Sequence, residues 1–339
     1  METPHPSLFP HRLDRIRRSV GSFLVDNTFR GLAYSSRYLP MAHPRLHGVE
    51  VIRHVPYTAG GHSAHLLDVY RPRGISAPMP VVLYVHGGGF RILSKESHWL
   101  MALIFARAGY LVFNINYRLA PEFPFPAAHM DAAQAYHFVV EKASEYGGDI
   151  GRLVLAGESA GGNIVTALTL ATCYRRPEAF AERLFELGVV PGAVAPACGI
   201  LEVSNCARYE GRRGIGRFLV DRIMEVEEAY LRHSSHALDQ HEIANPLQIL
   251  EKGEAPVRAL PPFFVPCGTW DPLLDDSYRL SRALAALGVR CDYRVYPRGI
   301  HAFHALVWQG IARQCWRDQL SFLREVLAQA EKKRAGSGT

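Results

Sequence analysis

The stretch from residue 153 to residue 163, LVLAGESAGGN, joins an apolar, strand-forming run to the helical pattern NIVTALTLATCY. At the junction, Gly157, Ser159 and Gly161 have the spacing G-x-S-x-G. A turn this sharp leaves no room for side chains two residues to either side of the serine, and glycine has none. The N–H group that follows the serine then lies near the positive end of a helix. The stretch therefore predicts a strand, a tight turn that exposes Ser159, and a helix.

Strand, loop and helix patterns alternate on both sides of this stretch. A helical pattern starts near Pro126 and ends near Tyr146, and another covers residues 277–287. Near-continuous apolar strands separated by helices are typical of a mostly parallel sheet covered on both faces, so the fold class is α/β. The expected strands are residues 81–85, 111–117, 153–157, 189–198, 263–268 and 292–296.

The first part of the sheet has a different pattern. VEVIRHVPYT and HLLDVYRP alternate apolar and polar residues around Gly60-Gly61, which predicts an antiparallel hairpin. His62 and His65 have a spacing that metal sites use. No carboxylate or cysteine in this segment completes such a set, so we assign no metal here.

Two segments fall outside the repeating pattern. Residues 1–46 mix basic and apolar residues at a spacing that allows short amphipathic helices, with a solvated helix face favoured over a membrane surface. Residues 204–250 contain GRRGIGR at 211–217 and a helical pattern at 219–233. A long excursion inside a repeating α/β fold is usually an insertion with a function, such as a lid over the site. A surface elaboration without a catalytic role is the alternative.

Composition excludes several classes of protein. The formal charge of +6 is spread along 339 residues without a recognition helix or zinc-finger spacing, which argues against nucleic acid as a partner. No apolar run approaches the roughly 20 residues of a membrane span, so we expect no stable membrane insertion. The six cysteines form no C-x-x-C pair, and reduced thiols are favoured over disulfides. Prolines and charges occupy the place of a signal peptide's apolar run, so we expect a soluble, cytoplasmic protein.

Activation of a serine requires a base and a carboxylate that holds the base in one tautomer. In sheets of this kind the carboxylate and then the histidine follow the serine along the chain. Asp271 follows the expected strand 263–268, and His301 follows the expected strand 292–296. Both lie just past the carboxyl ends of strands, where the sites of open parallel sheets form. We therefore expect Ser159, Asp271 and His301 to form a catalytic triad.

Three neighbouring residues compete for these roles. Asp275 and Asp276 fit the N-cap and first turn of the helix at 277–287 better than they fit a triad. His304 lies inside a helical pattern that we expect to pack on the sheet, so it is interpreted as structural.

The glycine run after the first parallel strand suits the binding of a developing negative charge. Residues without side chains let backbone N–H groups reach an oxyanion, and His86 opens such a run. We expect the N–H groups of Gly87, Gly88 and Ala160 to be the donors. A flexible glycine loop would be the alternative if the run stood alone.

Together these motifs resemble the hormone-sensitive-lipase-like family of α/β-hydrolase esterases. The resemblance covers about residues 67–303. It implies an eight-stranded α/β-hydrolase body, residues 47–203 and 251–339, and a helical cap from residues 1–46 and 204–250. It also implies hydrolysis of short- to medium-chain carboxylic esters through an acyl-enzyme, without a cofactor. His86, Glu158, Tyr117 and Arg118 are implied as a supporting shell. The motifs are HGGGF at 86–90, YRLAPE at 117–122, FPAA at 125–128, GESAGGN at 157–163, DPLLDD at 271–276 and His301.

Some features of the family pattern are missing or leave alternatives open. Ala302 follows the histidine where the family commonly has glycine, and the cap segments match no motif that would predict the substrate. An amidase or lactone hydrolase would use the same triad. A non-catalytic small-molecule binding protein on the same scaffold is a third reading, although it usually lacks the nucleophile or the base. The expected partner is a small-molecule ester, and the sequence leaves a homodimer open.

Overall fold

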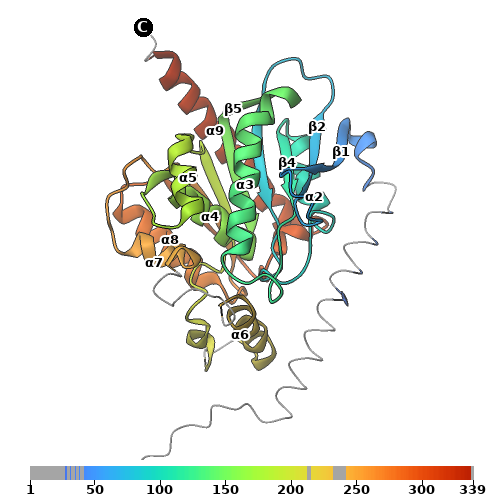
Figure 1. The fold of residues 1–339 in the computed structure, drawn as a ribbon. Helices are drawn as coiled ribbons and strands as arrows, with labels where there is room; N and C mark the ends of the chain where they lie inside the picture. Colours follow the sequence, from blue (N-terminus) through green and yellow to red (C-terminus); the bar gives the residue numbers. More distant parts are fainter. Residues whose placement is uncertain are drawn as a thin grey trace, which may run out of the picture.

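A single mixed sheet runs through the molecule, as the computed structural model shows (Figure 1). The structure describes residues 42–211, 215–231 and 242–336, and five isolated residues before Ala42. Most of the expected cap segment 1–46 and parts of the insertion therefore lie outside the described residues. Within those residues the sheet has eight strands in the order β1-β2-β4-β3-β5-β6-β7-β8. The strands are β1 (Val49–Pro56), β2 (Leu66–Pro72), β3 (Met79–Val85), β4 (Leu111–Ile115), β5 (Gly148–Glu158), β6 (Ala193–Ala197), β7 (Phe263–Gly268) and β8 (Cys291–Tyr296).

Strand direction agrees with the sequence pattern. β1 and β2 form the antiparallel hairpin, and β2 is also antiparallel to β4. The remaining neighbours, from β4 through β3 to β8, are parallel. The predicted α/β class and its mostly parallel sheet are confirmed.

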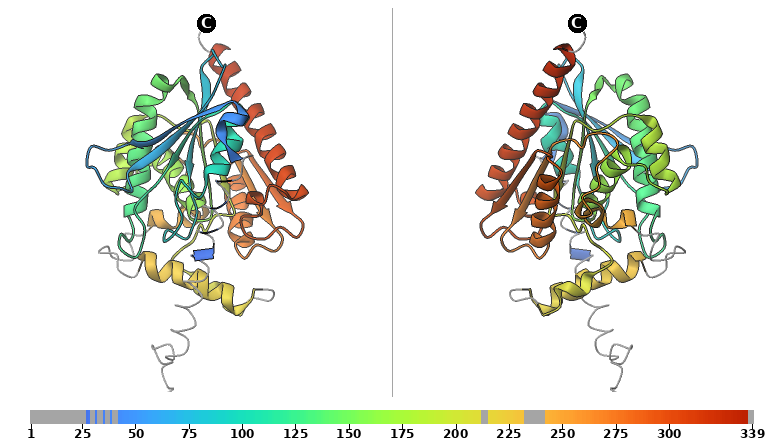
Figure 2. Two further views of the ribbon diagram at one scale, coloured as in Figure 1. Left: turned by 90° about the vertical axis from the view of Figure 1, so that its right-hand side faces the viewer. Right: turned by 90° about the vertical axis from the view of Figure 1, so that its left-hand side faces the viewer.

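Helices cover both faces of the sheet, which Figure 2 shows edge-on between α3 and α9. β3 explains why both faces are apolar: Val81, Leu83 and Val85 point into one core, and Val82 and Tyr84 point into the other. The first core includes α3, α4, α5, α7 and α8, and the second includes α2 and α9. The helices are α2 (Trp99–Arg107), α3 (Ala127–Lys142), α4 (Ala160–Cys173), α5 (Ala179–Leu187), α6 (Arg217–Leu231), α7 (Pro246–Glu251), α8 (Leu274–Ala286) and α9 (Gly310–Gly336).

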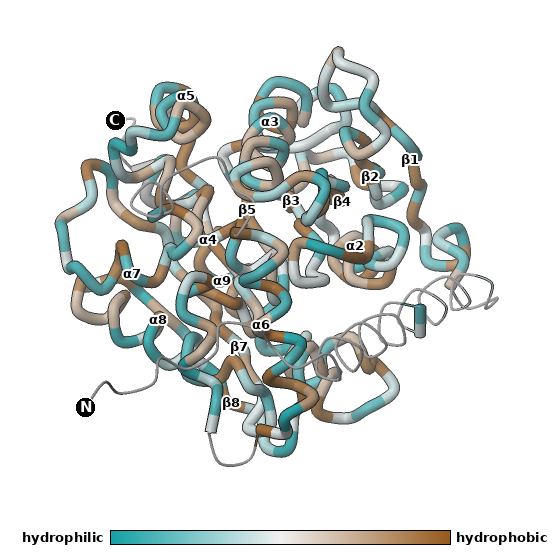
Figure 3. The backbone as a smooth tube through the Cα atoms, turned by 60° about the horizontal axis from the view of Figure 1, so that its bottom comes forward, coloured by the Kyte–Doolittle hydropathy of each residue, from teal (hydrophilic) through white to brown (hydrophobic). Residues whose placement is uncertain are grey.

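Helix α4 lies at the centre of this arrangement. All of its residues are buried, and in Figure 3 the strands and helices near it carry much of the hydrophobic colour. An apolar helix that is buried on every side is fixed by its neighbours rather than by one face. Among the residues described, no helix is both long and apolar enough to cross a membrane. All six cysteines, each inside the described ranges, are free thiols, as predicted.

Several boundaries differ from the predicted ones for local reasons. β4 ends at Ile115, not at residue 117, and the side chain of the next residue, Asn116, accepts a hydrogen bond from the Lys95 N–H at 2.6 Å. β6 begins at Ala193, after a Pro-Gly pair that interrupts the apolar run. β5 begins at Gly148, five residues before the predicted start, where it pairs with β3. The helix that begins after Pro126 ends at Lys142 and continues to Tyr146 as a 3-10 turn.

A buried lysine fixes the loop between β3 and α2. The Lys95 side chain is fully buried, and its Nζ lies 2.7 Å from Asp68 on β2 and 2.6 Å from Glu96. The Lys95 carbonyl accepts a hydrogen bond from Asn114 on β4 at 2.9 Å. Buried charges persist only when they are paired in this way. The loop is therefore tied to two strands at a point shortly after its glycine run.

We predict that Lys95→Met lowers the free energy of unfolding by about 3 kcal/mol or more, because it leaves Asp68 buried beside fewer positive charges. Urea unfolding followed by circular dichroism measures this. Lys142→Met is the matched control, since Lys142 is exposed and pairs only with Glu145 on the surface. Equal unfolding curves for the two variants would show that the buried pair does not stabilise the fold.

Candidate active site

Ser159 occupies a strained turn between β5 and α4. Its φ of 55° and ψ of −117° lie outside the regions that side-chain-bearing residues usually adopt. The turn is held by hydrogen bonds, since the Ser159 N–H donates to the Ala197 carbonyl on β6 at 3.0 Å and the Asn163 N–H donates to the Ser159 carbonyl at 3.1 Å. Hydrogen bonds to the neighbouring strand and to the first turn of α4 thus hold Ser159 in a backbone conformation that an isolated serine would avoid.

The structure explains why both flanking positions of the motif are glycine, for the reason that the sequence predicted. A Cβ atom on Gly157 would lie 2.6 Å from the Val85 carbonyl oxygen, and a Cβ atom on Gly161 would overlap the same oxygen. β3 therefore passes so close to the turn that neither position accommodates a side chain. The tight turn expected from the sequence is confirmed.

Asp271 and His301 are brought together by the loops that follow β7 and β8. The His301 Nδ1 atom lies 3.0 Å from each carboxylate oxygen of Asp271. The two loops are joined directly, because the Trp270 N–H donates to the Gly299 carbonyl at 2.9 Å. The Leu273 N–H donates to Asp271 Oδ1 at 2.8 Å and fixes the carboxylate. The structure therefore pairs the expected base with the expected carboxylate.

The carboxylate also changes the basicity of the imidazole. Burial by itself lowers the pKa of His301, but the charge of Asp271 and its hydrogen bond raise it, and the net pKa lies above its ordinary value. The charge of Glu158, the residue before the serine, adds to this increase. Ala302 follows in the left-handed conformation, with φ of 54°. This is the position where the family commonly has glycine, and the conformation shows why glycine suits it.

The glycine run curls sharply before α2. Gly88, Gly89 and Phe90 all have positive φ, and a Cβ atom on Gly88 would overlap the Ile92 carbonyl oxygen. The Gly87 N–H, however, donates to Glu158 Oε1 at 3.0 Å. The N–H hydrogen of Gly87, an expected oxyanion donor, thus has a carboxylate acceptor in this structure, and its role toward an oxyanion stays a prediction.

Three other N–H groups remain available near the serine. In the part of the chain that the structure describes, the N–H groups of Gly88, Gly89 and Ala160 donate no hydrogen bond. Gly88 and Ala160 were expected as donors, and Gly89 was not. The first glycine of the run thus joins the loop to the serine turn, and the next two are left with unpaired donors.

The implied supporting residues divide into two groups. The His86 ring stacks on Tyr117, with centroids 4.2 Å apart, and the Tyr117 hydroxyl donates to the His86 carbonyl at 2.9 Å. Both therefore support the start of the glycine loop. Arg118 pairs instead with Asp131 on α3, where its Nη2 lies 2.7 Å from Oδ1. This ion pair holds the loop after β4 against α3 and does not involve the glycine run.

Glu158 is the centre of a buried polar cluster that the sequence did not reveal. Its Oε1 atom pairs with His98 Nε2, and its Oε2 atom accepts a hydrogen bond from the Tyr84 hydroxyl. The other ring nitrogen of His98 lies 2.8 Å from Ser97 Oγ and 3.2 Å from the Ser94 carbonyl. With sixteen histidines in the chain and no motif around His98, no sequence signal marked this residue.

The pKa shifts in this cluster have opposite directions. Burial lowers the pKa of His98, but the charge of Glu158 outweighs burial and the net pKa is raised. Burial raises the pKa of Glu158, yet the His98 charge lowers it to about 2. For His86 and His304, burial dominates and lowers the pKa values to about 3 and about 4. His98 is therefore the histidine of this cluster whose charged form is favoured relative to an ordinary histidine.

The competing residues have structural roles. Asp275 and Asp276 lie in the first turn of α8, as expected, but neither is the N-cap, which is Leu273. Asp276 is buried and accepts hydrogen bonds from the Leu201 N–H at 2.8 Å and from Arg208 at 2.7 Å. His304 is buried in a 3-10 turn, and its carbonyl accepts a hydrogen bond from Trp316 on α9.

Helix α6 of the insertion packs directly on the glycine loop, beyond the carboxyl ends of the strands (Figure 1). The Tyr230 ring stacks on Phe90 with centroids 3.8 Å apart and planes 3° from parallel. Arg91 pairs with Glu225 at 3.3 Å. A Cβ atom on Gly89 would lie 2.7 Å from the Val226 side chain. Any movement of α6 would therefore change the surroundings of this loop.

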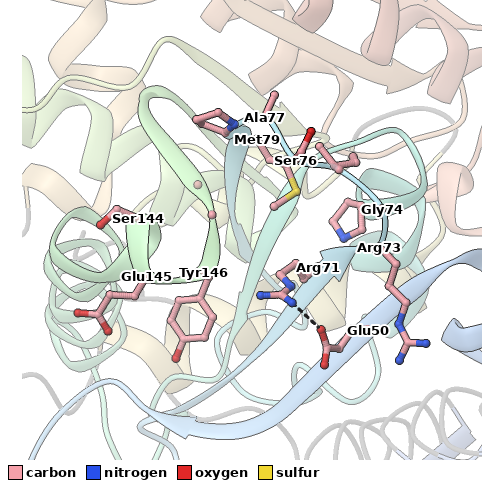
Figure 4. Close-up of a pocket in the computed structure, with 15 residues that line it drawn as sticks. Glu50, Arg71, Arg73, Gly74, Ser76, Ala77, Met79, Ser144, Glu145 and Tyr146 are labelled. Atoms are coloured by element: carbon pink, nitrogen blue, oxygen red, sulfur yellow. Dashed lines mark ion pairs between the residues drawn. The ribbon is translucent and has the colours of Figure 1, made fainter.

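Two cavities differ in their relation to the site. One of about 470 Å³ adjoins Asp271, and its walls include Ile215, Leu219, Trp270 and Tyr278. Another of about 780 Å³ lies around the Arg71–Glu50 ion pair (Figure 4). It includes the residues where β3 and β5 begin, at the opposite ends of these strands from Ser159. Only the first is placed to hold a group near the expected triad.

We predict that His98→Gln lowers the free energy of unfolding by about 3 kcal/mol, since it leaves the Glu158 carboxylate buried without its positive partner. Turnover should fall more than substrate affinity, because the carboxylate also holds Gly87. Thermal unfolding and steady-state kinetics measure the two effects.

The double variant His98→Gln with Glu158→Gln provides the control, because it removes the unpaired charge as well. It should recover part of the stability lost in the single variant. If the loss of stability in the double variant equals the sum of the losses in the His98→Gln and Glu158→Gln single variants, the two residues do not interact directly.

Comparison with known proteins agrees with this geometry. A family model described as alpha/beta hydrolase fold matches residues 82–305. Carboxylesterase NlhH of Mycobacterium tuberculosis is 31% identical over 237 residues, which cover 69% of this chain and 70% of that protein.

Solved structures show the same fold. Bacterial heroin esterase has a TM-score of 0.70 at 21% identity and covers 89% of this chain and 90% of its own. Esterase LipW from Mycobacterium marinum has a TM-score of 0.70 at 22% identity and covers 95% and 98%. The chain belongs to the hormone-sensitive-lipase-like family of α/β-hydrolases, as its motifs predicted.

Proposed function

We propose that the protein is a carboxylesterase that hydrolyses short- to medium-chain carboxylic esters, with Ser159, Asp271 and His301 as its catalytic triad. One observation carries the proposal: the imidazole of His301 faces both oxygens of Asp271 at 3.0 Å, at the sheet edge where Ser159 stands in a strained turn. The name of the M. tuberculosis relative, a carboxylesterase, supports the choice of substrate class.

In this mechanism His301 accepts the Ser159 proton as the hydroxyl oxygen attacks the ester carbonyl. Asp271 binds the Nδ1 side of the ring and so directs Nε2 to the proton transfer. It also stabilises the imidazolium that forms. The tetrahedral intermediate collapses, His301 returns the proton to the leaving alcohol, and the acyl group remains on Ser159. A water molecule activated by His301 then releases the acid.

The oxyanion is proposed to rest on the N–H groups of Gly88, Gly89 and Ala160. Their donors have no other acceptor among the described residues, and Ala160 opens α4, where the helix dipole favours negative charge. Gly87 takes a different task, since its bond to Glu158 sets the direction of the two glycines that follow. His98 and Tyr84 hold Glu158 in place and are positioning residues.

The insertion after β6 is the segment that we propose to form a cap over the site. We propose that the described part of the insertion covers the site, and the contact of α6 with the glycine loop supports this. The end of the insertion differs, because α7 contributes Leu247 and Leu250 to the core of the body. We propose that the cavity lined by Leu219 and Trp270 receives one of the two substrate groups.

Location and assembly are also proposals. Six free thiols favour a reducing compartment such as the cytoplasm, and a homodimer stays open. The same triad would cleave amides or lactones, and comparison of matched ester, amide and lactone substrates separates these activities. The pairing of His301 with Asp271 argues against a non-catalytic binding protein.

We predict that the purified protein hydrolyses p-nitrophenyl esters from acetate to octanoate, and that Ser159→Ala lowers kcat by at least about 10⁴-fold because the nucleophile is lost. A fluorophosphonate probe should label the wild type at Ser159 and leave the variant unlabelled. Ser281→Ala is the control, because that hydroxyl is exposed on α8 and donates to the Tyr278 carbonyl. Undiminished turnover of the Ser159 variant would refute the proposal.

We predict that kcat/KM falls as the pH drops through the pKa of His301, because the base must be neutral to accept a proton. The midpoint should lie above the ordinary histidine value of 6.5, since Asp271 raises this pKa. Asp271→Asn removes the raising charge and leaves burial, so its midpoint should move to lower pH while kcat falls by about 10⁴-fold. The pH profile of kcat/KM checks both. An unchanged midpoint in the variant would mean that another group controls the profile.

A further inference from the structure

Cys198 lies beside the Asp271–His301 pair, and the proposed reaction gives it no task. It follows β6 directly, and its N–H donates to the Pro266 carbonyl on β7 at 3.1 Å. Its Sγ atom, one carboxylate oxygen of Asp271 and one ring nitrogen of His301 all lie within 4.8 Å of one another. Among the described residues, this is the one group of three metal-ligating side chains so close together.

The three donors are of the kinds that zinc prefers. Thiolate, carboxylate and imidazole bind Zn²⁺ at about 2.0–2.3 Å, and three protein ligands with a water molecule complete a tetrahedral site. Donor atoms at these bond lengths lie roughly 3.5 Å apart around a tetrahedral ion. The His301 Nδ1 atom lies 3.0 Å from the Asp271 oxygens, and all three donor atoms lie within 4.8 Å of one another, so side-chain movement on the order of 1 Å would bring them into contact with one ion.

Charge and access also suit a divalent ion. A thiolate and a carboxylate would together neutralise Zn²⁺ in a site that otherwise disfavours an unpaired buried charge. Cys198 and Asp271 are buried, but the His301 side chain is 33% exposed, so an ion can arrive along its ring. The Nδ1 atom of His301 already faces Asp271, so Nδ1 is the ring nitrogen that would bind an ion held by that carboxylate.

We propose that Cys198, Asp271 and His301 form an inhibitory zinc site. As the ion binds, the Cys198 thiol releases its proton to solvent and its sulfur coordinates zinc. The Nδ1 proton of His301 is lost while Nε2 gains one, so the ring stays neutral and donates its Nδ1 lone pair to the metal. One proton is released for each zinc bound. Nε2 then carries a proton and does not accept the one from Ser159, so turnover stops until a chelator removes the ion.

Cys267 provides a matched control. It is also buried and packs in the same small cluster as Cys198. Burial first, and next the charge of Asp271, raise the pKa of its thiol. It does not belong to the group of three ligands. Replacement of either cysteine by serine removes one buried thiol beside the same carboxylate, but only one replacement removes a proposed ligand.

The first experiment measures p-nitrophenyl ester hydrolysis during titration with zinc chloride, and it rests on the proposed esterase function. Zinc should inhibit the wild type, and EDTA should restore turnover. Cys198→Ser should retain zinc-free turnover and need at least about tenfold more zinc for half-inhibition. Cys267→Ser should respond like the wild type. Equal zinc sensitivity in the wild type and the Cys198 variant, or an equal loss in both cysteine variants, would overturn the assignment.

The second experiment does not depend on turnover. Cobalt(II) replaces zinc at such sites, and a thiolate ligand gives a charge-transfer absorption in the near ultraviolet. The band should appear at one cobalt per protein in the wild type, in Cys267→Ser and in Ser159→Ala, and be absent in Cys198→Ser. Cys198→Ala replaces the serine variant if that variant does not fold. Absence of the band in the wild type overturns the zinc site, whereas a cobalt band without ester hydrolysis overturns only the proposed function.

Discussion

The buried carboxylate of Glu158 is the interaction on which the rest of the site depends. A charge with almost no solvent exposure is stable only with partners, and its partners come from separate parts of the chain. Tyr84 belongs to β3, Gly87 to the glycine loop, and His98 to the residue before α2. Since Glu158 also precedes the serine, the turn that carries Ser159 and the glycine loop, which we propose to bind the oxyanion, are held by one side chain. Their relative position follows from a hydrogen-bond network rather than from the sheet alone.

The same cluster separates two electrostatic tasks. Glu158 pairs with His98, whose pKa it raises, whereas His86 and His304 stay neutral because burial lowers their pKa values to about 3 and about 4. Of these three histidines, only His98 has its charged form favoured by its surroundings. Burial lowers the pKa of His301, and Asp271 raises it more than Glu158 does. Glu158 therefore organises the scaffold and adds a smaller increase to the basicity of the imidazole, whereas Asp271 supplies the larger increase.

The features that sequence could predict are those fixed by short-range geometry. Gly157 and Gly161 were predictable because any tight turn at Ser159 excludes side chains there, and Asp271 and His301 because each follows a strand. The acceptor of the Gly87 N–H could not be predicted from the sequence, because that acceptor, Glu158, lies 71 residues away along the chain. His98 is a similar case, since only tertiary packing places it against Glu158. The predicted end of β4 was wrong at Asn116, the residue after the strand, whose side chain bonds Lys95 in a loop 21 residues away in the sequence.

Helix α6 joins the described part of the insertion to the glycine loop. The helix stacks Tyr230 on Phe90, whose positive φ completes the curl of the glycine loop. The Tyr230 hydroxyl also lies 2.7 Å from His129 Nδ1 on α3, and its carbonyl accepts a hydrogen bond from the Phe125 N–H. Helix α6 is therefore anchored in the body at the same residue that packs on the glycine loop. If this loop binds the oxyanion as proposed, a substrate that displaces α6 would disturb its donors, whereas one that fits beneath α6 would leave them in place. The fit of the acyl or alcohol group would then change the stabilisation of the oxyanion.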